Sequence, residues 1–446
     1  MFFRTRTVGA CLAMAAAISG CGSDDDSAIA VGGAGGASSH AGAGGGAAAG
    51  KSSTGDAGNS ETGDAGSSAA GAGDEAVTRE AVVKTYAANL SAGYDDAVQD
   101  EKDFKVVVSA FLADPTEDNL DKARTSWLAS RAHYMLTEGA RFYGGPIDVD
   151  PPNDESFVNS WPLDEAYIDY TTQIDKDGNQ VVDETQGIIN MPDVLETITA
   201  AGLDKLNAAG GDENISSGYH AVEFLLWGQA LKLVGPGERP ASDYDPNGPR
   251  KNVDRRSKYL MVAIDGIIDH LQDVADGWTP TADYRVGFED PANLTDSLTN
   301  MFTGLAKFSK GELAGERIRA AYQSKERHDQ HDCFSSKTLT DYTRDAIGIQ
   351  NIYLGKYGDN DGPGIDDLIR AVDPAEDAKL ETMLQASIDA IKAIPEPFEA
   401  SIAGADTSPG RQAILAAINA LSAQGDEFGI AAGKLGLTIM VDDPEE

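Results

Sequence analysis

Residues 76–115 read AVTREAVVKTYAANLSAGYDDAVQDEKDFKVVVSAFLADP, and their apolar side chains recur at helical rather than strand spacing. Pro115 ends this pattern, because a proline inside a helix removes a hydrogen bond and clashes with the preceding turn. Residues 116–144 open with Thr116, a residue type that caps helix N-termini, and then continue with helical spacing. The sequence therefore predicts two consecutive helices at the start of the folded region.

Helical spacing also dominates the chain beyond these two segments. The further predicted helices cover residues 192–209, 217–233, 252–275, 295–324, 339–353, 374–394 and 408–435. Residues 144–192 have the composition of loops, and strand-like alternation is scarce. We predict an all-α fold of antiparallel helices in two packed bundles, because roughly 370 folded residues exceed what one bundle core usually holds. The loops at 234–250 or 276–294 would separate the bundles.

The N-terminal residues have the pattern of a lipoprotein signal peptide. Two arginines precede an apolar stretch at 8–18 that is too short to span a bilayer, and small residues stand directly before Cys21. We predict that residues 1–20 are a signal peptide and that Cys21 is lipidated and anchors the protein to a membrane. An ordinary signal peptide that contains a cysteine by chance is the alternative.

Composition then separates a tether from a folded domain. Residues 21–75 are mostly Gly, Ala, Ser, Thr and Asp, which cannot bury enough apolar surface to fold, so we predict a flexible tether. Residues 76–440 form the predicted folded domain. Gly22 after the lipidated cysteine favours the outer membrane, with the domain facing the periplasm or the cell surface. Cys333 is the one cysteine of the folded domain, which excludes an intrachain disulfide there, and we predict that it is buried and unreactive.

The net charge is −38 over 446 residues. Such acidity argues against nucleic acid as a partner, because phosphate binding needs clustered Lys and Arg. It favours solubility and attracts cations in general, without defining a metal site.

Residues 218–228, GYHAVEFLLWG, contain the strongest candidate site. On a helix, His220 and Glu223 lie on one face with Cβ atoms about 5–6 Å apart, so an imidazole nitrogen and a carboxylate oxygen can bind one metal ion. The alternative is a polar pair in which Glu223 accepts a hydrogen bond from His220. The zinc-peptidase pattern His-Glu-x-x-His is absent, because residues 221 and 224 are Ala and Phe.

This segment resembles the Gly-x-His-x-x-Glu signature of the imelysin family, and the resemblance continues in ordered blocks along the chain. The similar blocks are residues 126–148 (SWLASRAHYMLTEGARFYGGPID), 160–170 (SWPLDEAYIDY), 235–244 (GPGERPASDY), 311–322 (GELAGERIRAAY) and 331–358 (HDCFSSKTLTDYTRDAIGIQNIYLGKYG). In the family, the last block usually begins with His-Ser-Cys-Phe-Ser-Asp-Asn-Thr-His. This chain departs from it with Ser336, Lys337 and Leu339.

The resemblance implies a helical periplasmic or outer-membrane protein with two bundle-like subdomains and a site between them. It implies that His220 and Glu223 are metal ligands and that His331 adds a second imidazole. A histidine bonded to backbone at a helix start is the alternative for His331. The family was first named for peptidases, and other members resemble iron-regulated proteins of iron uptake, so the fold does not settle the function.

Five further residues of these blocks are candidates for the site. Glu138 follows Arg131 by seven residues, so both can face one side of a helix; we predict Glu138 as a metal ligand and Arg131 as a lining residue, with a structural ion pair as the alternative. Arg141 and Asp148 flank the GGPID turn and are predicted to line the site, with bracing of the loop as the alternative for Asp148. Gly218 opens the signature and is predicted to line the site as well.

We therefore predict a cell-envelope lipoprotein that binds a divalent metal ion, Fe or Zn by its nitrogen and oxygen ligands, and that is linked to iron uptake through an envelope partner. A metallopeptidase of the imelysin type is one alternative, and it would need an open coordination position and a base. A periplasmic protein that binds a polymer or a peptide in the bundle cleft is the other.

Overall fold

The computed structural model describes residues 77–149 and 154–441. The predicted signal peptide, Cys21 and the tether lie outside the described residues. All described residues belong to one compact unit. Among them, no helix combines the length and the apolar character that crossing a bilayer requires.

Helices make up most of the described residues, and two short hairpins are the only sheets among them, which confirms the predicted all-α class. The longer helices are α1 (Arg79–Ala113), α2 (Glu117–Ser130), α7 (Gly218–Trp227), α8 (Val253–Gly277), α10 (Leu294–Lys307), α12 (Thr338–Tyr353), α14 (Pro374–Lys392) and α16 (Pro409–Lys434). The shorter helices are α3 (Ala132–Thr137), α4 (Glu155–Val158), α5 (Glu165–Ile168), α6 (Ala200–Leu206), α9 (Asp283–Phe288), α11 (Ala320–Ser324), α13 (Ile365–Val372) and α15 (Phe398–Ile402). Antiparallel hairpins pair β1 (Thr171–Ile174) with β2 (Gln180–Asp183) and β3 (Lys356–Tyr357) with β4 (Asn360–Asp361).

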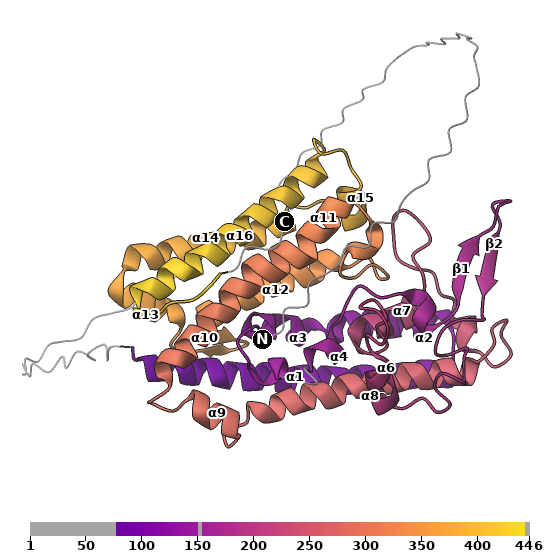
Figure 1. The fold of residues 1–446 in the computed structure, drawn as a ribbon, viewed down its shortest axis with the longest axis horizontal. Coiled ribbons are helices and arrows are strands. Elements are labelled where there is room, and N and C mark those ends of the chain that lie inside the picture. The colour runs from indigo at the N-terminus through magenta and orange to yellow at the C-terminus, as the bar shows by residue number, and fades with distance from the viewer. Residues whose placement is uncertain (1–76, 150–153, 442–446) are drawn as a thin grey trace, which may run out of the picture. The chain divides into compact units, whose positions relative to one another are not determined.

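The first part of the described chain forms one helical layer around α1 and α8 (Figure 1). These two helices run antiparallel, because Lys102 of α1 contacts Gln272 of α8, whereas Lys105 pairs with Asp265. Helices α2 and α3 pack against α1, and α7 packs against both α2 and α8. Helix α7 is therefore held inside this layer by its neighbours.

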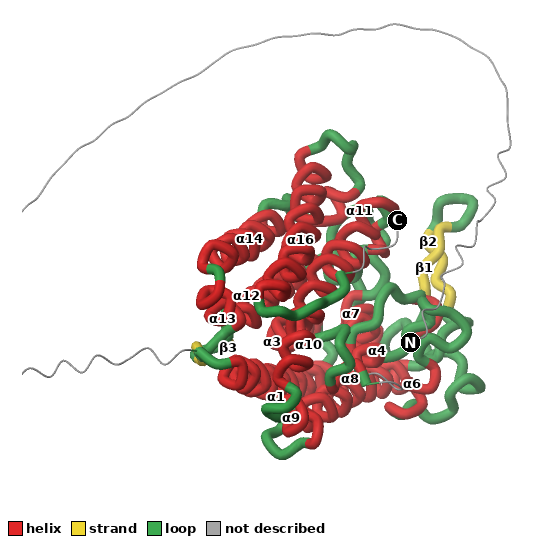
Figure 2. Tube along the Cα trace, turned by 60° about the vertical axis from the view of Figure 1, so that its left-hand side comes forward, coloured by secondary structure: helices red, strands yellow, loops and turns green. Residues whose placement is uncertain are grey.

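The later helices form a second layer, in which α12, α14, α16 and α10 follow one another in space (Figures 1 and 2). Helix α10 continues through the π-helical segment Phe308–Arg319 into α11. This run packs antiparallel on α16, because Ser309 donates a hydrogen bond to the carbonyl of Leu421 and Arg411 donates one to the carbonyl of Tyr322. The predicted helix over 295–324 is therefore present, but it contains a π-helical segment that apolar spacing does not reveal.

The two layers share one continuous apolar core. Helix α3 packs on α12, and α1 contacts α10. Gly348 makes the first of these approaches close, because a Cβ at this position would lie 2.5 Å from the carbonyl oxygen of Leu136. The chain passes from one layer to the other between α8 and α10, inside the loop at 276–294.

Several predicted segments differ in detail from the structure. The predicted helix at 116–144 is interrupted at Arg131 and its α-helical part ends at Thr137, and the predicted loop at 276–294 contains α9. The segment 144–192, predicted as loop, contains α4, α5 and the β1–β2 hairpin. The predicted helix at 192–209 is helical only in α6. The predicted helix at 217–233 ends at Trp227, because Gly228 adopts a φ of 70° that helical residues do not have.

Candidate metal centre

Helix α7 carries the histidine–glutamate pair inside the protein, and all of its residues are buried. Gly218, its first residue, has a φ of 85°, and a Cβ there would lie 2.6 Å from the carbonyl oxygen of Val158. Because only glycine accepts both conditions, α7 can begin directly against α4. Gly218 thus acts by setting the position of the helix backbone.

Glu223 fixes the orientation of His220. Its Oε2 lies 3.2 Å from His220 Nδ1, and its Oε1 accepts a hydrogen bond of 2.6 Å from the backbone N–H of Ser335. When Nδ1 donates to Glu223, Nε2 carries a free lone pair, and this atom has no hydrogen-bond partner among the described residues. His220 and Glu223 therefore form the hydrogen-bonded pair that the sequence analysis gave as the alternative to joint metal binding. This pair still leaves Nε2 of His220 available as a ligand.

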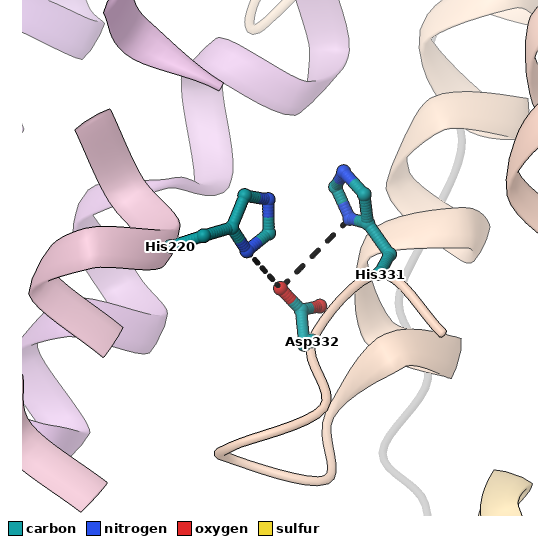
Figure 3. A group of neighbouring side chains, drawn as sticks. All are labelled: His220, His331 and Asp332. Carbon is teal, nitrogen blue, oxygen red and sulfur yellow. Dashed lines mark ion pairs between the residues drawn. The ribbon is translucent and has the colours of Figure 1, made fainter. Parts of the chain in front are cut away.

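His331 and Asp332 approach His220 from the turn that precedes α12 (Figure 3). Asp332 Oδ1 lies 3.8 Å from Nδ1 of His220 and 3.8 Å from Nδ1 of His331. The two imidazole centroids are 4.5 Å apart. One ligand atom from each of these three residues lies within 4.8 Å of the others, which is close enough to share a metal ion.

Several atoms of this group are buried without a hydrogen-bond partner in the described part of the chain. They include both carboxylate oxygens of Asp332, Nδ1 of His331 and Nε2 of His220. These three residues are at most 2% exposed. Because buried polar atoms are almost always satisfied, four such atoms in one place indicate that a cation or ordered water completes the group.

Arg131, at the junction of α2 and α3, neutralises one further carboxylate. Its Nη2 lies 2.5 Å from Asp341 Oδ2 and 3.5 Å from Asp332 Oδ1. Burial opposes ionisation of Asp341, but Arg131 and His331 hold the pKa of this carboxyl well below its usual range. The guanidinium also lies over the ring of Tyr219, 4.7 Å from its centroid. Arg131 therefore lines the group and compensates Asp341.

Burial changes the protonation of the candidate ligands. It lowers the pKa of His220 well below its ordinary value and that of His331 to about 4, so both imidazoles are neutral at pH 7. It raises the pKa of Glu223 to about 7 and raises the pKa of Asp332 as well. Neutral imidazole is the form that binds a metal, and a bound cation favours ionised carboxylates. Because Arg131 already compensates Asp341, a divalent cation would balance the charges of Glu223 and Asp332.

Glu138 lies outside this group, in a second buried network. Its carboxylate is 2.5 Å from Nη1 of Arg317 and 3.2 Å from Nη1 of Arg141. Arg317 in turn lies 3.0 Å from Asp345 of α12. Burial acts against ionisation, but Arg317 and Arg141 lower the pKa of Glu138 to about 2. Asn159 links the two networks, because it accepts a hydrogen bond from Arg131 and donates one to Glu138.

The remaining predicted lining residues have structural contacts away from the three-residue group. Arg141 pairs with Glu155 as well as Glu138, at 3.0 Å. Asp148 accepts hydrogen bonds from the backbone N–H groups of Tyr143 and Gly144, which is the loop-bracing role. Cys333 is buried, as predicted, and burial raises the pKa of its thiol, which keeps it protonated.

A second set of side chains within ligand distance lies on α13 and α14, namely Asp366, Asp377 and Glu381. Arg370 occupies its centre and pairs with all three carboxylates, at 2.6, 2.7 and 3.2 Å. An internal guanidinium already supplies the positive charge there. The histidine-containing group is therefore the better candidate metal centre.

Sequence reasoning does not single out Asp332, Asp341 or Asn159. Asp332 stands where the family block quoted above has Ser, so the resemblance draws attention away from it. Its position beside His331 was the available signal, because adjacent ligands on a tight turn can face one cation. Nothing in the local sequence of Asp341 or Asn159 indicates that they reach Arg131, since these contacts span 210 and 28 residues.

Comparison with known proteins identifies relatives of the chain. The sequence pattern of one protein family, described as imelysin, matches residues 90–428. The crystal structure of a candidate iron-regulated protein A precursor from Parabacteroides distasonis ATCC 8503 is similar, with a TM-score of 0.60, 19% identity, and coverage of 82% of this chain and 97% of that chain. An imelysin-like protein from Psychrobacter arcticum 273-4 has a TM-score of 0.55, 13% identity, and coverage of 82% and 98%. At these identities the two structures show a shared fold. No curated protein matches the chain.

Proposed function

The chain belongs to the imelysin family, and from this premise we propose that it binds one divalent metal ion through His220, His331 and Asp332. Glu223 orients His220 through its contact with Nδ1, as carboxylates commonly do for metal-bound imidazoles. The observation that carries the proposal is the convergence of buried imidazole and carboxylate atoms that have no hydrogen-bond partner among the described residues.

The donor set favours a borderline metal ion. Two imidazole nitrogens with carboxylate oxygens suit Fe(II) or Zn(II), whereas Cys333, the one thiol among the described residues, is not part of the group. Three protein ligands leave at least one coordination position for water or for a small ligand. We propose Fe or Zn as the cargo or cofactor.

We further propose that this metal site serves iron handling at the cell envelope. One structural relative is named as an iron-regulated protein, which supports this direction for a chain with the same fold. In this proposal Cys21 carries lipid, the residues that follow it form the tether, and the metal-binding domain passes its ion to an envelope partner. Mass spectrometry of the protein from membranes tests the anchor, because Cys21→Ser must remove the acyl mass.

Burial argues against peptidase activity at this centre. His220 is 2% exposed and Glu223 is 0% exposed, so a polypeptide cannot reach the group as it stands. A hydrolytic mechanism would also need a carboxylate free to act as a base, whereas both oxygens of Glu223 already accept hydrogen bonds and Asp332 is a proposed metal ligand. Incubation with unfolded casein, with and without a chelator, tests this point: we expect no chelator-sensitive cleavage.

Metal analysis tests the binding proposal. Purified protein is loaded either with Fe(II) under anaerobic conditions or with Zn(II). It is then desalted, and its metal content is measured by elemental mass spectrometry. We expect about one equivalent in the wild type and almost none in His220→Ala, because each ligand contributes strongly to affinity. His328→Ala is the matched control, because the His328 side chain is 59% exposed and only three residues before His331. Full retention of metal in His220→Ala would overturn the proposal.

A further inference from the structure

A cavity separate from the metal centre lies where α7 ends. It has a volume of about 260 Å³ and is bounded by the β1–β2 hairpin and by the loop that follows Gly228. Lys232, Arg239 and Arg250 line it, and Glu238 is its one acidic lining residue. Lys232 pairs with Glu238, so the unbalanced positive charge of the cavity comes from its arginines; in a chain with a net charge of −38, this points to an anionic ligand.

The arginines near the cavity carry more positive charge than the neighbouring carboxylates neutralise. Arg256 covers Asp169 with two hydrogen bonds of 2.7 and 2.9 Å. Arg239 Nη1 then bridges Asp169 and Asp243 at 2.8 and 3.3 Å. Arg250 approaches Asp243 only to 3.5 Å through Nε. Three guanidinium groups therefore face two carboxylates, and Arg250 is the one left with the weakest pairing.

Of the two arginines that line the cavity, Arg250 keeps the greater donor capacity. Arg239 is 3% exposed and its Nη1 is already shared by Asp169 and Asp243, whereas the Arg250 side chain is 23% exposed and approaches a carboxylate only through Nε. The Arg250 guanidinium lies over Tyr170, 4.6 Å from the ring centroid, which holds it at the cavity wall. Planar guanidinium groups with free N–H donors match the geometry of carboxylate and phosphate oxygens.

We propose that this cavity binds a small molecule through a carboxylate or phosphate group. The backbone of Gly237, in the cavity loop, donates a hydrogen bond of 2.8 Å to the carbonyl of Phe334, in the turn that carries His331 and Asp332. Arg327 joins the same two segments by donating to the carbonyls of Gly235 and Cys333. The anion cavity and the metal centre therefore share one supporting loop. Anion binding in the cavity does not depend on a bound metal.

Titration calorimetry of the full-length protein tests the proposal with succinate and inorganic phosphate as separate probes, and with succinamide as the uncharged control. We expect one of the two anions to bind with a Kd below about 10 mM and succinamide not to bind. The probe that binds decides between carboxylate and phosphate. Absence of heat with both anions up to about 10 mM would overturn the proposal.

Two variants and a matched control locate the binding. Arg250→Gln should lower the affinity for the anion at least tenfold, which corresponds to about 1.4 kcal/mol of binding free energy. Lys232→Gln should weaken it by a smaller factor, and this side chain is 62% exposed, so the variant keeps the fold. Lys251→Gln is the matched control, because Lys251 follows Arg250 in the sequence but does not line the cavity. It removes the same charge and should leave the affinity within about twofold of the wild-type value. Equal weakening by Arg250→Gln and Lys251→Gln, or none by Arg250→Gln, would overturn the assignment.

Discussion

At the scale of single residues, the centre depends on side chains that have few other roles. Asp332 is fully buried, and neither of its oxygens has a hydrogen-bond partner in the described part of the chain. A carboxylate in this state costs free energy unless a cation or a proton compensates it. Glu223 differs, because its two oxygens already hold His220 and the backbone of Ser335. Asp332 is thus predicted to bind metal directly, and Glu223 to orient a ligand.

Replacement of Asp332 separates these roles. Asp332→Asn should lower metal affinity at least tenfold, because an amide oxygen is a weaker ligand and carries no charge, and it should leave the fold stable. Competition with a chromogenic chelator measures the affinity. Asp329→Asn, three residues away on the more exposed short helix Arg327–Asp329, should bind as the wild type does. An unchanged affinity in Asp332→Asn would remove Asp332 from the ligand set.

The pH dependence of metal binding should follow the carboxylates and not the histidines. Burial lowers the pKa of His220 well below its ordinary value and that of His331 to about 4, so protons do not compete with a metal for either imidazole near neutrality. Burial raises the pKa of Glu223 to about 7, so Glu223 takes up a proton as the pH falls through 7, and its hydrogen bond from His220 Nδ1–H is then weakened. We expect affinity to fall between pH 8 and pH 6, which are about one unit either side of that pKa. Glu223→Gln should flatten this profile; an identical profile would contradict the assignment.

The sequence identifies part of the site because some of its residues are close in the chain. One helical turn joins His220 to Glu223, and family resemblance adds His331. The contacts of Arg131 with Asp341 and of Glu138 with Arg317 depend on how α3 packs against α12 and the π-helical segment, which no local pattern encodes. Glu138 shows the difference: its spacing from Arg131 places both on one helix face, yet it pairs with Arg317 and Arg141.

At the scale of elements, the start of α7 sets the position of the centre. Gly218→Ala should destabilise the protein by about 2 kcal/mol or more, because alanine is strained at a φ of 85° and its Cβ would meet the backbone of α4. Gly266→Ala is the matched control within α8: nothing lies within 4 Å of a Cβ there, so it should stabilise by about 0.5–1 kcal/mol. Urea denaturation measures both, and equal effects would contradict the account.

His270 of α8 connects three helices and makes stability depend on pH. It lies 2.8 Å from Asp154, before α4, and 3.5 Å from Asp204 of α6. Burial opposes its charge, but the two carboxylates raise its pKa from 6.5 to about 9. Its stabilising contribution is therefore complete below pH 6.5 and is lost as the pH rises through 9.

His270→Gln should accordingly destabilise the protein by about 2 kcal/mol at pH 6, and clearly less near pH 9.5. Denaturant titrations at the two pH values measure the difference. His328→Gln, at an exposed histidine, is the matched control and should change the stability at pH 6 by less than about 0.5 kcal/mol. A destabilisation by His270→Gln that is the same at both pH values would mean that packing on Phe157, 4.6 Å between ring centroids, accounts for the whole effect.

Long elements were predictable and short ones were not. Helices α1, α8, α12, α14 and α16 follow apolar spacing over several turns, so their predicted bounds agree closely with the structure. Helix α7 ends early because Gly228 leaves the helical region, and a glycine inside an apolar run does not reveal this in sequence. Each strand of the β1–β2 hairpin has four residues, which is too short for an alternating apolar and polar pattern to be recognised in the sequence.

At the scale of the whole domain, the candidate centre lies where the two helical layers meet. His220 belongs to the first layer, and His331 and Asp332 belong to the turn before α12 in the second. The ion pairs Arg131–Asp341 and Glu138–Arg317 cross the same boundary. A bound cation would therefore join the layers as well as satisfy its ligands, and the protein should unfold at a higher temperature when metal is bound.

Anomalous diffraction from crystals grown with Fe(II) or Zn(II) tests the metal assignment most directly. We expect one strong peak about 2.0–2.3 Å from a ring nitrogen of His220, a ring nitrogen of His331 and a carboxylate oxygen of Asp332, with Glu223 still hydrogen-bonded to His220. A peak at Asp366, Asp377 and Glu381 alone, or density at the histidine group that is only water, would contradict it.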